Sequence, residues 1–499
     1  DVSDLVVLLD HLLYLSPKTL SWDTAQTHQL HLMVPRCRHR RRRTTSSTSE
    51  APGSEYRSTL PSMPDVVVVG AGVMGASIAL ELQRIGRSVL VVDRGDAVGA
   101  GSTSASSAVV RFNYSTLAGV TAAWESAHRW ADWVGHLGHT SGADPLARFV
   151  TCPMLFFEPP GFPRAEATAL LSAVGVPWEV LDETGLKQRF PAIDPGRYHP
   201  PRRPDDPRFD IGPSGQLDAV LTPDSGFIDD PQLAAVNLMN AARHLGTEVR
   251  LRSEVVEVRR SGTNPDRTIG ITLADGTQID TTVVVNAAGP WSSGLNHLAG
   301  VFTGATDGVV TNRPMRQEVH VVPAPEQFVL DGGGAMMSDL DLGYYARPQP
   351  GGTLLVGGVE PECDPMEWLD DPDVTPANPT VECFEAQVWR LARRLPGLAI
   401  PHRPSGLAGV YDVTPDWVPI YDRTSLDGFY VAIGTSGNQF KNAPLVGQIM
   451  CEIIEACESG HDHDAQAVTT WCDRIDRSLD LGAFSRLRAL TPTTGTVMG

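Results

Sequence analysis

The chain has 499 residues, of which 41% are hydrophobic, and this length predicts two or three globular domains instead of one simple core. Its formal net charge is −19 and its pI is near 5.1. Nucleic-acid binding gains from a basic surface that releases counterions, so this charge argues against a nucleic-acid partner.

Membrane and disulfide signals are weak. The longest weakly polar stretch, residues 66–80, is shorter than the roughly 20 residues of a membrane helix and contains three glycines, so no membrane span is expected. The seven cysteines are dispersed, odd in number and without a CxxC pair, which predicts neither a disulfide framework nor a zinc site. A reducing compartment, the cytoplasm, is favoured.

Residues 1–63 differ in composition from the rest and form an expected leader that is disordered or not part of the mature fold. The run RCRHRRRRTTSSTS is basic and Ser-rich, as in a transit peptide, which would place the protein in the mitochondrial matrix. Transit peptides are poor in acidic residues, however, and this segment contains Asp1, Asp4, Asp10 and Asp23. The folded protein is expected to begin near Met63.

Residues 64–99 are predicted to form a strand, a tight turn, a helix and a second strand. A β-branched run at 66–69 precedes the GxGxxG motif, whose turn and close contacts with pyrophosphate require its three glycines. The helix has apolar residues at Ile78, Leu82 and Ile85 and is expected to end at Gly86. Asp93, at the end of the second strand, can bind the ribose hydroxyls. These features predict a site for FAD or NAD, whereas a glycine turn alone could also serve packing. The motif consists of Gly70, Gly72 and Gly75.

Two later segments favour FAD. Residues 247–295 predict paired strands, a hairpin at Asp275-Gly276 and a buried strand ending in NAAG, where Gly289 passes the cofactor. Residues 428–454 predict a strand, a Gly-rich turn and a helix. The helix N-terminus, near Pro444, can face an electron-rich group such as the flavin N1–C2=O edge.

The Gly-rich turn contains a lysine in a chain that otherwise uses arginine. Only Lys18, Lys187 and Lys441 occur among 40 basic residues. A lysine retained at 441 therefore suggests that a compact ammonium is needed there.

The chain resembles the D-amino-acid oxidase and sarcosine oxidase superfamily of FAD-dependent oxidoreductases, which includes sarcosine and dimethylglycine dehydrogenases. The resemblance extends from Pro64 to about Glu458 and is carried by GAGVMG with Asp93, GSTSASSAVVRFNY, VVNAAGPW, YDVTPD and GTSGNQFK. It implies an α/β fold: a Rossmann-type FAD-binding domain built from discontinuous segments, with an inserted α+β, mixed-sheet substrate domain. The implied FAD-binding segments are 64–115, 216–300 and 405–458, the substrate-domain segments are 116–215 and 301–404, and 459–499 is a C-terminal extension.

The resemblance also implies site residues. Arg111 and Lys441 would hold a substrate carboxylate over the flavin, by a bidentate fork and a point charge respectively. Tyr114, Tyr345 and Tyr411 match positions of aromatic substrate contacts. Residues implied to bind the cofactor are Gly70, Gly72, Val73, Met74, Gly75, Asp93, Arg94, Ser102, Thr103, Val255, Ala288, Gly289, Gly437, Asn438, Gln439, Phe440 and Lys441.

Two departures from the family pattern refine the expected chemistry. Gly409 and Ala105 occupy the places where relatives attach FAD covalently, so the FAD is expected to be noncovalent. Leu355 or Val356 occupies the place of the lysine that assists oxygen reduction in one oxidase branch, and no lysine occurs between 188 and 440. A slow oxidase and a dehydrogenase that passes electrons to an acceptor protein both remain open.

The predicted reaction is oxidation of the C–N bond of a small amino acid or N-alkyl amino acid, with hydride transfer to flavin N5. The alternatives are a hydroxy-acid dehydrogenase and a flavin-binding assembly factor with little turnover. His461 and His463 lie in an acidic stretch that is expected to be a solvated linker, and no metal site is expected.

Overall fold

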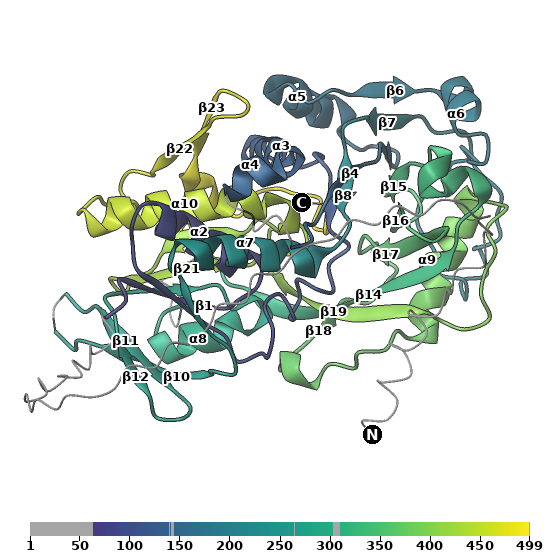
Figure 1. The fold of residues 1–499 in the computed structure, drawn as a ribbon. Coiled ribbons are helices and arrows are strands. Elements are labelled where there is room, and N and C mark those ends of the chain that lie inside the picture. The colour runs from purple at the N-terminus through teal and green to yellow at the C-terminus, as the bar shows by residue number, and fades with distance from the viewer. Residues whose placement is uncertain (1–62, 139, 141–143, 264, 303–309, 499) are drawn as a thin grey trace, which may run out of the picture. The chain divides into compact units, whose positions relative to one another are not determined.

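The computed structural model describes residues 63–138, 140, 144–263, 265–302 and 310–498 (Figure 1). Except for Met63, the expected leader lies outside the described residues. None of the helices in these ranges is long and apolar enough to span a membrane.

The first sheet gathers strands from three distant parts of the chain (Figure 1). All neighbouring pairs are parallel except the antiparallel pair of β20 and β21. This arrangement confirms the predicted buried strands at 66–69 and before NAAG. In spatial order the strands are β20 (Ile420–Arg423), β21 (Phe429–Ile433), β13 (Val283–Asn286), β1 (Val66–Val69), β2 (Val89–Val92) and β9 (Glu248–Arg250).

Both faces of this sheet are buried. Successive residues of a strand point to opposite faces, so each strand contributes side chains to two cores. Val66 and Val68 pack into a core built with helices, and Val67 and Val69 pack into a second core on the other face. The helices are α2 (Val73–Arg84), α3 (Leu117–Ala131), α7 (Pro231–Leu245) and α10 (Ala443–Glu458). The opposite face is covered by α8 (Ser292–Ala299) and a small sheet of β10 (Val255–Arg260), β11 (Thr268–Leu273) and β12 (Gln278–Asp280).

Two local predictions can be compared with these elements. The antiparallel pair β11 and β12 turns at Asp275-Gly276, as predicted. The prediction that Ile85 belongs to the apolar face of α2 is wrong. The helix ends at Arg84, so Ile85 is its C-cap and is 51% exposed.

The second sheet is larger and mixed, with β5 and β15 as its parallel pair and antiparallel pairing elsewhere. Its strands follow the order β18, β14, β17, β16, β15, β5, β7 and β6, and β19 pairs with β14. Their bounds are β5 (Met154–Phe157), β6 (Glu179–Leu181), β7 (Ala219–Thr222), β14 (Arg313–Pro323), β15 (Met336–Asp339), β16 (Tyr344–Gln349), β17 (Thr353–Gly358), β18 (Glu367–Trp368) and β19 (Gly406–Val413).

The two faces of this sheet have different roles. One face packs on α9 (Val381–Arg394) and α6 (Glu183–Arg189). The other contributes Tyr345 and Tyr411 to a core that also contains Val497 and Met498. Neighbouring side chains of β16 thus point to opposite faces: Tyr344 packs in the core with α9, and Tyr345 packs against the core that contains Val497.

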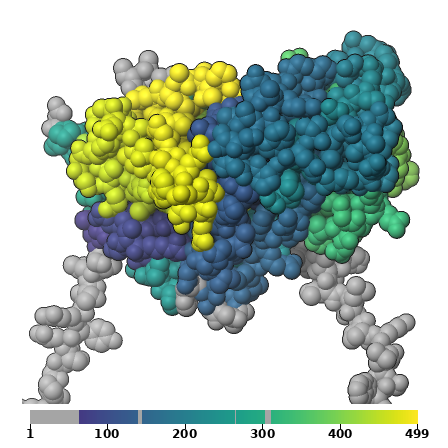
Figure 2. All heavy atoms as spheres, turned by 90° about the horizontal axis from the view of Figure 1, so that it is seen from above, coloured from purple at the N-terminus to yellow at the C-terminus, as the bar shows by residue number. Residues whose placement is uncertain are grey.

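The remaining elements are short. A three-stranded sheet is formed by β3 (Val109–Val110), β4 (Phe149–Thr151) and β8 (Gly226–Ile228). Helices α4 (Trp133–Leu137) and α5 (Arg164–Val174) fall between β3 and β8 in the sequence. The hairpin of β22 (Thr469–Cys472) and β23 (Arg477–Asp480) contacts α3, and Figure 2 shows yellow C-terminal residues packed against the blue segment. The extension 459–499 therefore returns to the folded body.

Strand pairing also bears on the expected domain limits. β7 and β19 belong to the second sheet, although they fall in ranges 216–300 and 405–458 expected for the FAD-binding domain. The expected limits themselves stay predictions.

Candidate functional site

A cavity of about 790 Å³ lies where both sheets and the C-terminal residues meet. This volume is in the upper part of the usual ligand-pocket range of about 300–1,000 Å³. Every residue predicted for the site lines it except Gly75 and Tyr114. Segments that are hundreds of residues apart in the chain thus contribute to one site.

The glycine turn after β1 brings backbone against backbone. Gly70 has φ +115°, and a Cβ there would lie 2.3 Å from the carbonyl oxygen of Ala287. A Cβ on Gly75 would lie 1.9 Å from the carbonyl oxygen of Gly70, so Gly75 packs the helix on the turn and does not line the cavity. Only glycine fits either position, as a dinucleotide cradle requires.

Asp93 closes this turn from the end of β2. Its Oδ2 accepts a hydrogen bond from the Ala71 N–H at 2.6 Å, and its Oδ1 accepts one from the Gly95 N–H at 2.7 Å. The carboxylate lines the cavity beside the glycine turn. It is therefore placed where a ribose hydroxyl can reach it.

The segment after β2 forms another wall. Thr103 Oγ1 accepts a hydrogen bond from the Val73 N–H at 3.1 Å, and Ser102 donates to the Val410 carbonyl at 2.7 Å. Arg94 and Trp291 line the cavity next to this segment. Arg94 Cζ lies 4.7 Å from the centre of the Trp291 ring, and the guanidinium pairs with Asp373. Trp291 also donates to Asp373 at 2.8 Å. The sequence prediction missed Trp291 and Asp373.

The third wall is the Gly-rich turn between β21 and α10. Gly437 has φ +67°, and a Cβ there would lie 2.3 Å from the Tyr411 ring. Asp412 fixes this turn because its Oδ2 accepts from the Gly434 N–H at 2.6 Å and its carbonyl accepts from the Ser436 N–H at 2.7 Å. Burial raises the pKa of Asp412 to about 7.

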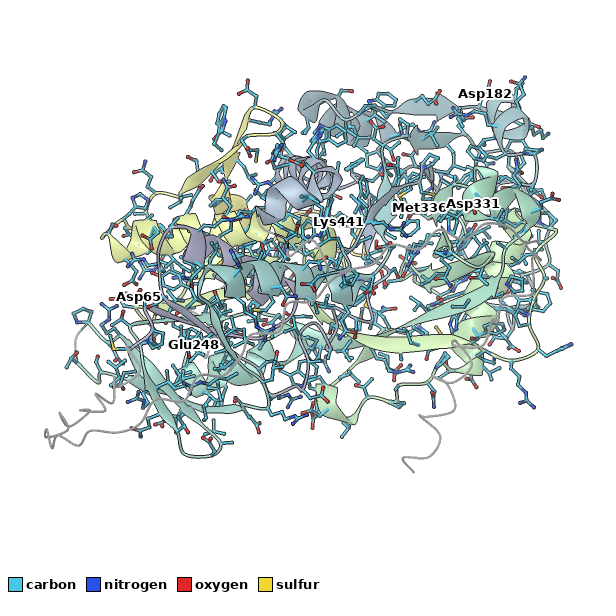
Figure 3. All side chains as sticks on the ribbon, viewed as in Figure 1. Asp65, Asp182, Glu248, Asp331, Met336 and Lys441 are labelled. Atoms are coloured by element: carbon cyan, nitrogen blue, oxygen red, sulfur yellow. The ribbon has the colours of Figure 1, made fainter. Side chains whose placement is uncertain are left out.

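Lys441 lies in the interior, in the 3₁₀ helix Phe440–Asn442, and is 3% exposed (Figure 3). Its Nζ donates to Tyr114 Oη at 2.8 Å and to the Asn438 carbonyl at 2.6 Å. Burial, followed by the charge of Arg111, holds the pKa of Lys441 well below its usual value. An anion in the cavity would reverse this shift.

Arg111 is a second buried cation, 4% exposed, on the same wall. Its Nη2 donates to the Val497 carbonyl at 2.6 Å, and its Nη1 donates to the Asn113 carbonyl. Both cations lie near the Tyr114 ring: Arg111 Cζ at 4.8 Å and Lys441 Nζ at 4.9 Å from its centre. Among the described residues neither forms an ion pair with a carboxylate.

The three predicted tyrosines differ in their contacts. Tyr114 donates to the Asn438 carbonyl at 2.7 Å, and burial raises its pKa to about 12. Tyr345 Oη lies 2.5 Å from Ser107 Oγ, and burial raises its pKa to about 12 as well. Tyr345 and Tyr411 line the cavity, whereas Tyr114 lies behind the two cations and orients Lys441.

A noncovalent dinucleotide fits this cavity. The glycine turns leave room for close approach of a ligand, and no cysteine or histidine is among the described residues that line the cavity. Gly409 and Ala105, from which the sequence predicts a noncovalent flavin, both line it, and a Cβ on Gly409 would lie 3.0 Å from Ala105 Cβ.

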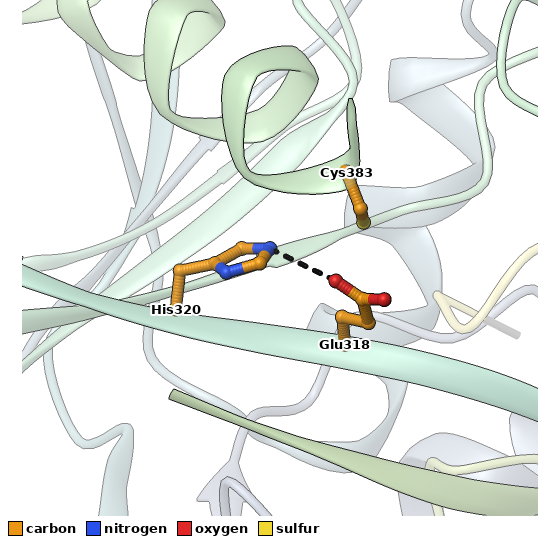
Figure 4. A group of neighbouring side chains, drawn as sticks. All are labelled: Glu318, His320 and Cys383. Carbon is orange, nitrogen blue, oxygen red and sulfur yellow. Dashed lines mark ion pairs between the residues drawn. The ribbon is translucent and has the colours of Figure 1, made fainter. Parts of the chain in front are cut away.

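Glu318, His320 and Cys383 form a separate cluster, on β14 and at the start of α9, with their potential ligand atoms within 4.8 Å of one another (Figure 4). Glu318 already accepts hydrogen bonds from Arg316 and from the Thr380 N–H. The Arg316 guanidinium, which is paired with Glu318, opposes a divalent cation at this place. We assign this cluster to packing.

The acidic stretch near 461 also differs from expectation. His463 is 3% exposed, with Nε2 3.6 Å from Asp422 Oδ1, so the prediction of a solvated linker is wrong for this residue. Its Nδ1 accepts from the Val468 N–H at 3.0 Å. The stretch anchors the extension to the folded body.

The described site therefore combines a glycine cradle, a carboxylate placed for a ribose and a second glycine turn, which are the features of a dinucleotide-binding oxidoreductase. The profile described as DAO, FAD dependent oxidoreductase, matches residues 65–453. The chain belongs to this family, and its cofactor is noncovalent FAD.

Curated relatives share moderate identity. The 4-methylaminobutanoate oxidase (formaldehyde-forming) of Paenarthrobacter nicotinovorans is 27% identical over 416 residues, covering 81% of this chain and 45% of that protein. The chain thus spans less than half of that relative. The probable sarcosine oxidase of Arabidopsis thaliana is 26% identical over 412 residues, covering 79% of this chain and 89% of that protein.

Solved structures share the fold. L-Proline dehydrogenase from P. horikoshii superposes with a TM-score of 0.63 at 22% identity, covering 81% of this chain and 95% of that chain. Glycine oxidase from Geobacillus kaustophilus has a TM-score of 0.61 at 20% identity, with coverages of 81% and 97%.

Proposed function

We propose that this enzyme oxidises the C–N bond of a small amino acid or N-alkyl amino acid, with Arg111 and Lys441 binding the substrate carboxylate. The main support is that two buried cations line a single cavity and that neither is paired with a carboxylate among the described residues. A buried unpaired cation is costly, and a substrate anion would relieve that cost. The relatives named as sarcosine and 4-methylaminobutanoate oxidases support an amine substrate.

The chain's residues position the substrate. Arg111 offers a planar fork to the carboxylate and Lys441 offers an ammonium, while Tyr114 keeps Lys441 oriented toward the cavity. Tyr345 and Tyr411 shape the adjoining wall. Most of the rate would come from this positioning and from charge stabilisation, without a strong side-chain base.

Bound FAD supplies an acceptor for the hydride that leaves the carbon next to nitrogen. The nitrogen lone pair then forms the C=N bond, and water adds to that bond to release an amine and a carbonyl compound. The electrons leave to oxygen or to an acceptor protein. Slow use of oxygen is favoured because the lysine expected to assist oxygen reduction has no counterpart: the described residues between 188 and 440 contain no lysine.

An anaerobic screen of flavin absorbance tests this proposal against its alternatives. N-alkyl amino acids or amino acids should bleach the flavin. Bleaching only by hydroxy acids would support a hydroxy-acid dehydrogenase, and no bleaching by either class would support a flavin-binding assembly factor. A cytoplasmic or mitochondrial location stays a prediction.

A further inference from the structure

The cavity opens to solvent beside the carboxyl ends of β2 and β13. Arg94, which follows β2, and Leu298, in α8, line the cavity and are exposed. Gly101 is also exposed and lines it, and a Cβ there would lie 3.7 Å from the ring of Trp291, which follows β13. A residue that lines a cavity and is exposed lies at its opening. We call these four residues the mouth of the cavity.

Residues 370–375 form a strap that reaches this mouth from the second sheet. Before the strap, β18 pairs with β14, and the Leu369 N–H donates to the Pro314 carbonyl at 3.0 Å. After the strap, the Ala408 N–H, in β19, donates to the Ala377 carbonyl at 3.0 Å. Both ends are thus fixed to the second sheet, and the strap between them lies at the surface.

Asp373 attaches the strap to two residues of the mouth. Its Oδ2 accepts a hydrogen bond from Arg94 Nη1 at 2.8 Å, and its Oδ1 accepts one from the Trp291 indole N–H at 2.8 Å and another from Arg94 Nη2. In the described part of the chain, no other polar contact joins residues 370–375 to the segments that follow β2 and β13. Asp373 itself does not line the cavity. One carboxylate therefore holds the strap at the mouth from outside the cofactor cavity.

This attachment is open to solvent and local. The side chains of Arg94 and Asp373 are 39% and 47% exposed, so water and salt compete with their ion pair. The Asp373 N–H donates to Asp371 Oδ1 at 2.9 Å inside the 3₁₀ turn η4 (Pro372–Val374), and this bond does not involve the mouth. The strap can therefore release Arg94 and Trp291 and keep its own turn. Such a local opening costs far less free energy than global unfolding.

We propose that the strap is a gate for the FAD cofactor and that Asp373 is its latch. The latch keeps the stacked Arg94 and Trp291 side chains in place at the mouth, and FAD enters or leaves when the bonds of Asp373 break. Because Asp373 lies outside the cavity, its bonds form with or without FAD. They therefore slow the entry and the release of FAD to a similar extent and change its affinity little. The inference concerns cofactor exchange and does not rest on the proposed substrate.

Two rate constants test the latch. Dissociation is measured on FAD-loaded enzyme by exchange of the bound cofactor for isotopically labelled FAD. Association is measured from the change in flavin fluorescence when FAD is added to enzyme from which the noncovalent cofactor has been removed. Asp373→Ala removes all three bonds of the latch, and Asp373→Asn removes its charge but keeps one acceptor oxygen.

Asp373→Ala should raise both rate constants about tenfold, the size expected for a half-exposed, charge-assisted pair and one further hydrogen bond. Their ratio, the dissociation constant of FAD, should change less than about threefold. Asp373→Asn should raise both rates about threefold. Added salt should speed exchange in the wild type more than in Asp373→Ala, because salt screens the ion pair. Asp370→Ala, which removes a fully exposed carboxylate of the same strap, is the matched control and should exchange FAD at the wild-type rate.

Three results would overturn the proposal. Unchanged rate constants in Asp373→Ala would show that the strap does not limit exchange. Faster dissociation with unchanged association would show that Asp373 only stabilises bound FAD. Slower dissociation would show that Asp373 holds the Arg94 guanidinium away from the pyrophosphate of FAD. If Asp373→Ala does not fold, Asp373→Asn decides between the same outcomes. These readouts follow cofactor binding alone, so they are valid whether or not an amine reduces the flavin.

Discussion

Replacing Lys441 by methionine removes one charge from the proposed carboxylate site and leaves the fold intact. The side chain is 3% exposed, and methionine has a similar length. The acceptors that Lys441 serves are not orphaned, because Tyr114 still donates to the Asn438 carbonyl at 2.7 Å. A hydrogen bond to a charged group contributes about 1.5–3 kcal/mol, so the dissociation constant of a carboxylate ligand should rise roughly 10- to 150-fold.

Proton linkage gives this prediction a second readout. Carboxylate binding raises the pKa of Lys441 from its depressed value in the free enzyme, so protons are taken up on binding. Affinity for 3,3-dimethylbutanoate, an unreactive carboxylate, should therefore fall as the pH rises through that depressed pKa. Glu360, which accepts a hydrogen bond from the Val497 N–H, also titrates, so the difference between wild-type enzyme and Lys441→Met isolates the lysine contribution.

The assay is calorimetric titration of 3,3-dimethylbutanoate in two buffers with different ionisation enthalpies, combined with titration of flavin absorbance. Lys441→Arg should bind almost as weakly as Lys441→Met, because a guanidinium is too large for this buried position. Lys187→Met, an exposed lysine paired with Glu183, is the control. Normal binding by Lys441→Arg, or identical proton uptake by wild type and Lys441→Met, would refute the reasoning.

Three further predictions concern the cofactor and stability. Gly437→Ala should lose FAD or most of its turnover because a Cβ would meet the Tyr411 ring at 2.3 Å, whereas Gly86→Ala, with φ +90° and open space, should cost only about 1–2 kcal/mol of stability. Retention of FAD by Gly437→Ala would contradict the close-packed turn. Acid precipitation should leave the flavin in the supernatant, and flavin in the pellet would indicate a covalent bond. Because burial raises the pKa of Glu360 from 4.5 to about 8, its protonated form stabilises the fold at low pH and that stability is lost as the pH rises toward 8. Between pH 6 and 8 the wild type should lose about 2 kcal/mol more than Glu360→Gln in denaturant unfolding, and parallel losses would contradict the assigned cause.

The sequence supported the cofactor half of the site well. The order of β1, glycine turn, α2, β2 and Asp93 is local, so spacing and periodicity were enough to predict it. The Asp275-Gly276 hairpin was equally local. Lys441 stood out by its Gly-rich turn and by the scarcity of lysine in the chain, but its pairing with Arg111 at a substrate carboxylate required the family resemblance.

The remaining residues depend on tertiary contacts that no local pattern encodes. Val497 reaches Arg111 across 386 positions, and the resemblance ends near residue 458, so nothing in the sequence placed that segment in the cavity. Glu360 follows an ordinary strand, and its bond to the Val497 N–H joins residues 137 positions apart. Asp412 lies in the recognised YDVTPD motif, but its bond to the Gly434 N–H becomes visible only when β19 and β21 are brought together.

Anaerobic mixing of the FAD-loaded enzyme with an N-methyl or N,N-dimethyl glycine tests the central claim most directly, with flavin absorbance and the released aldehyde measured together. The account predicts bleaching with one aldehyde formed per flavin reduced, and loss of both signals in Arg111→Met/Lys441→Met with FAD still bound. Undiminished turnover by the double variant, or no bleaching by any amino acid while a hydroxy acid reduces the flavin, would contradict it.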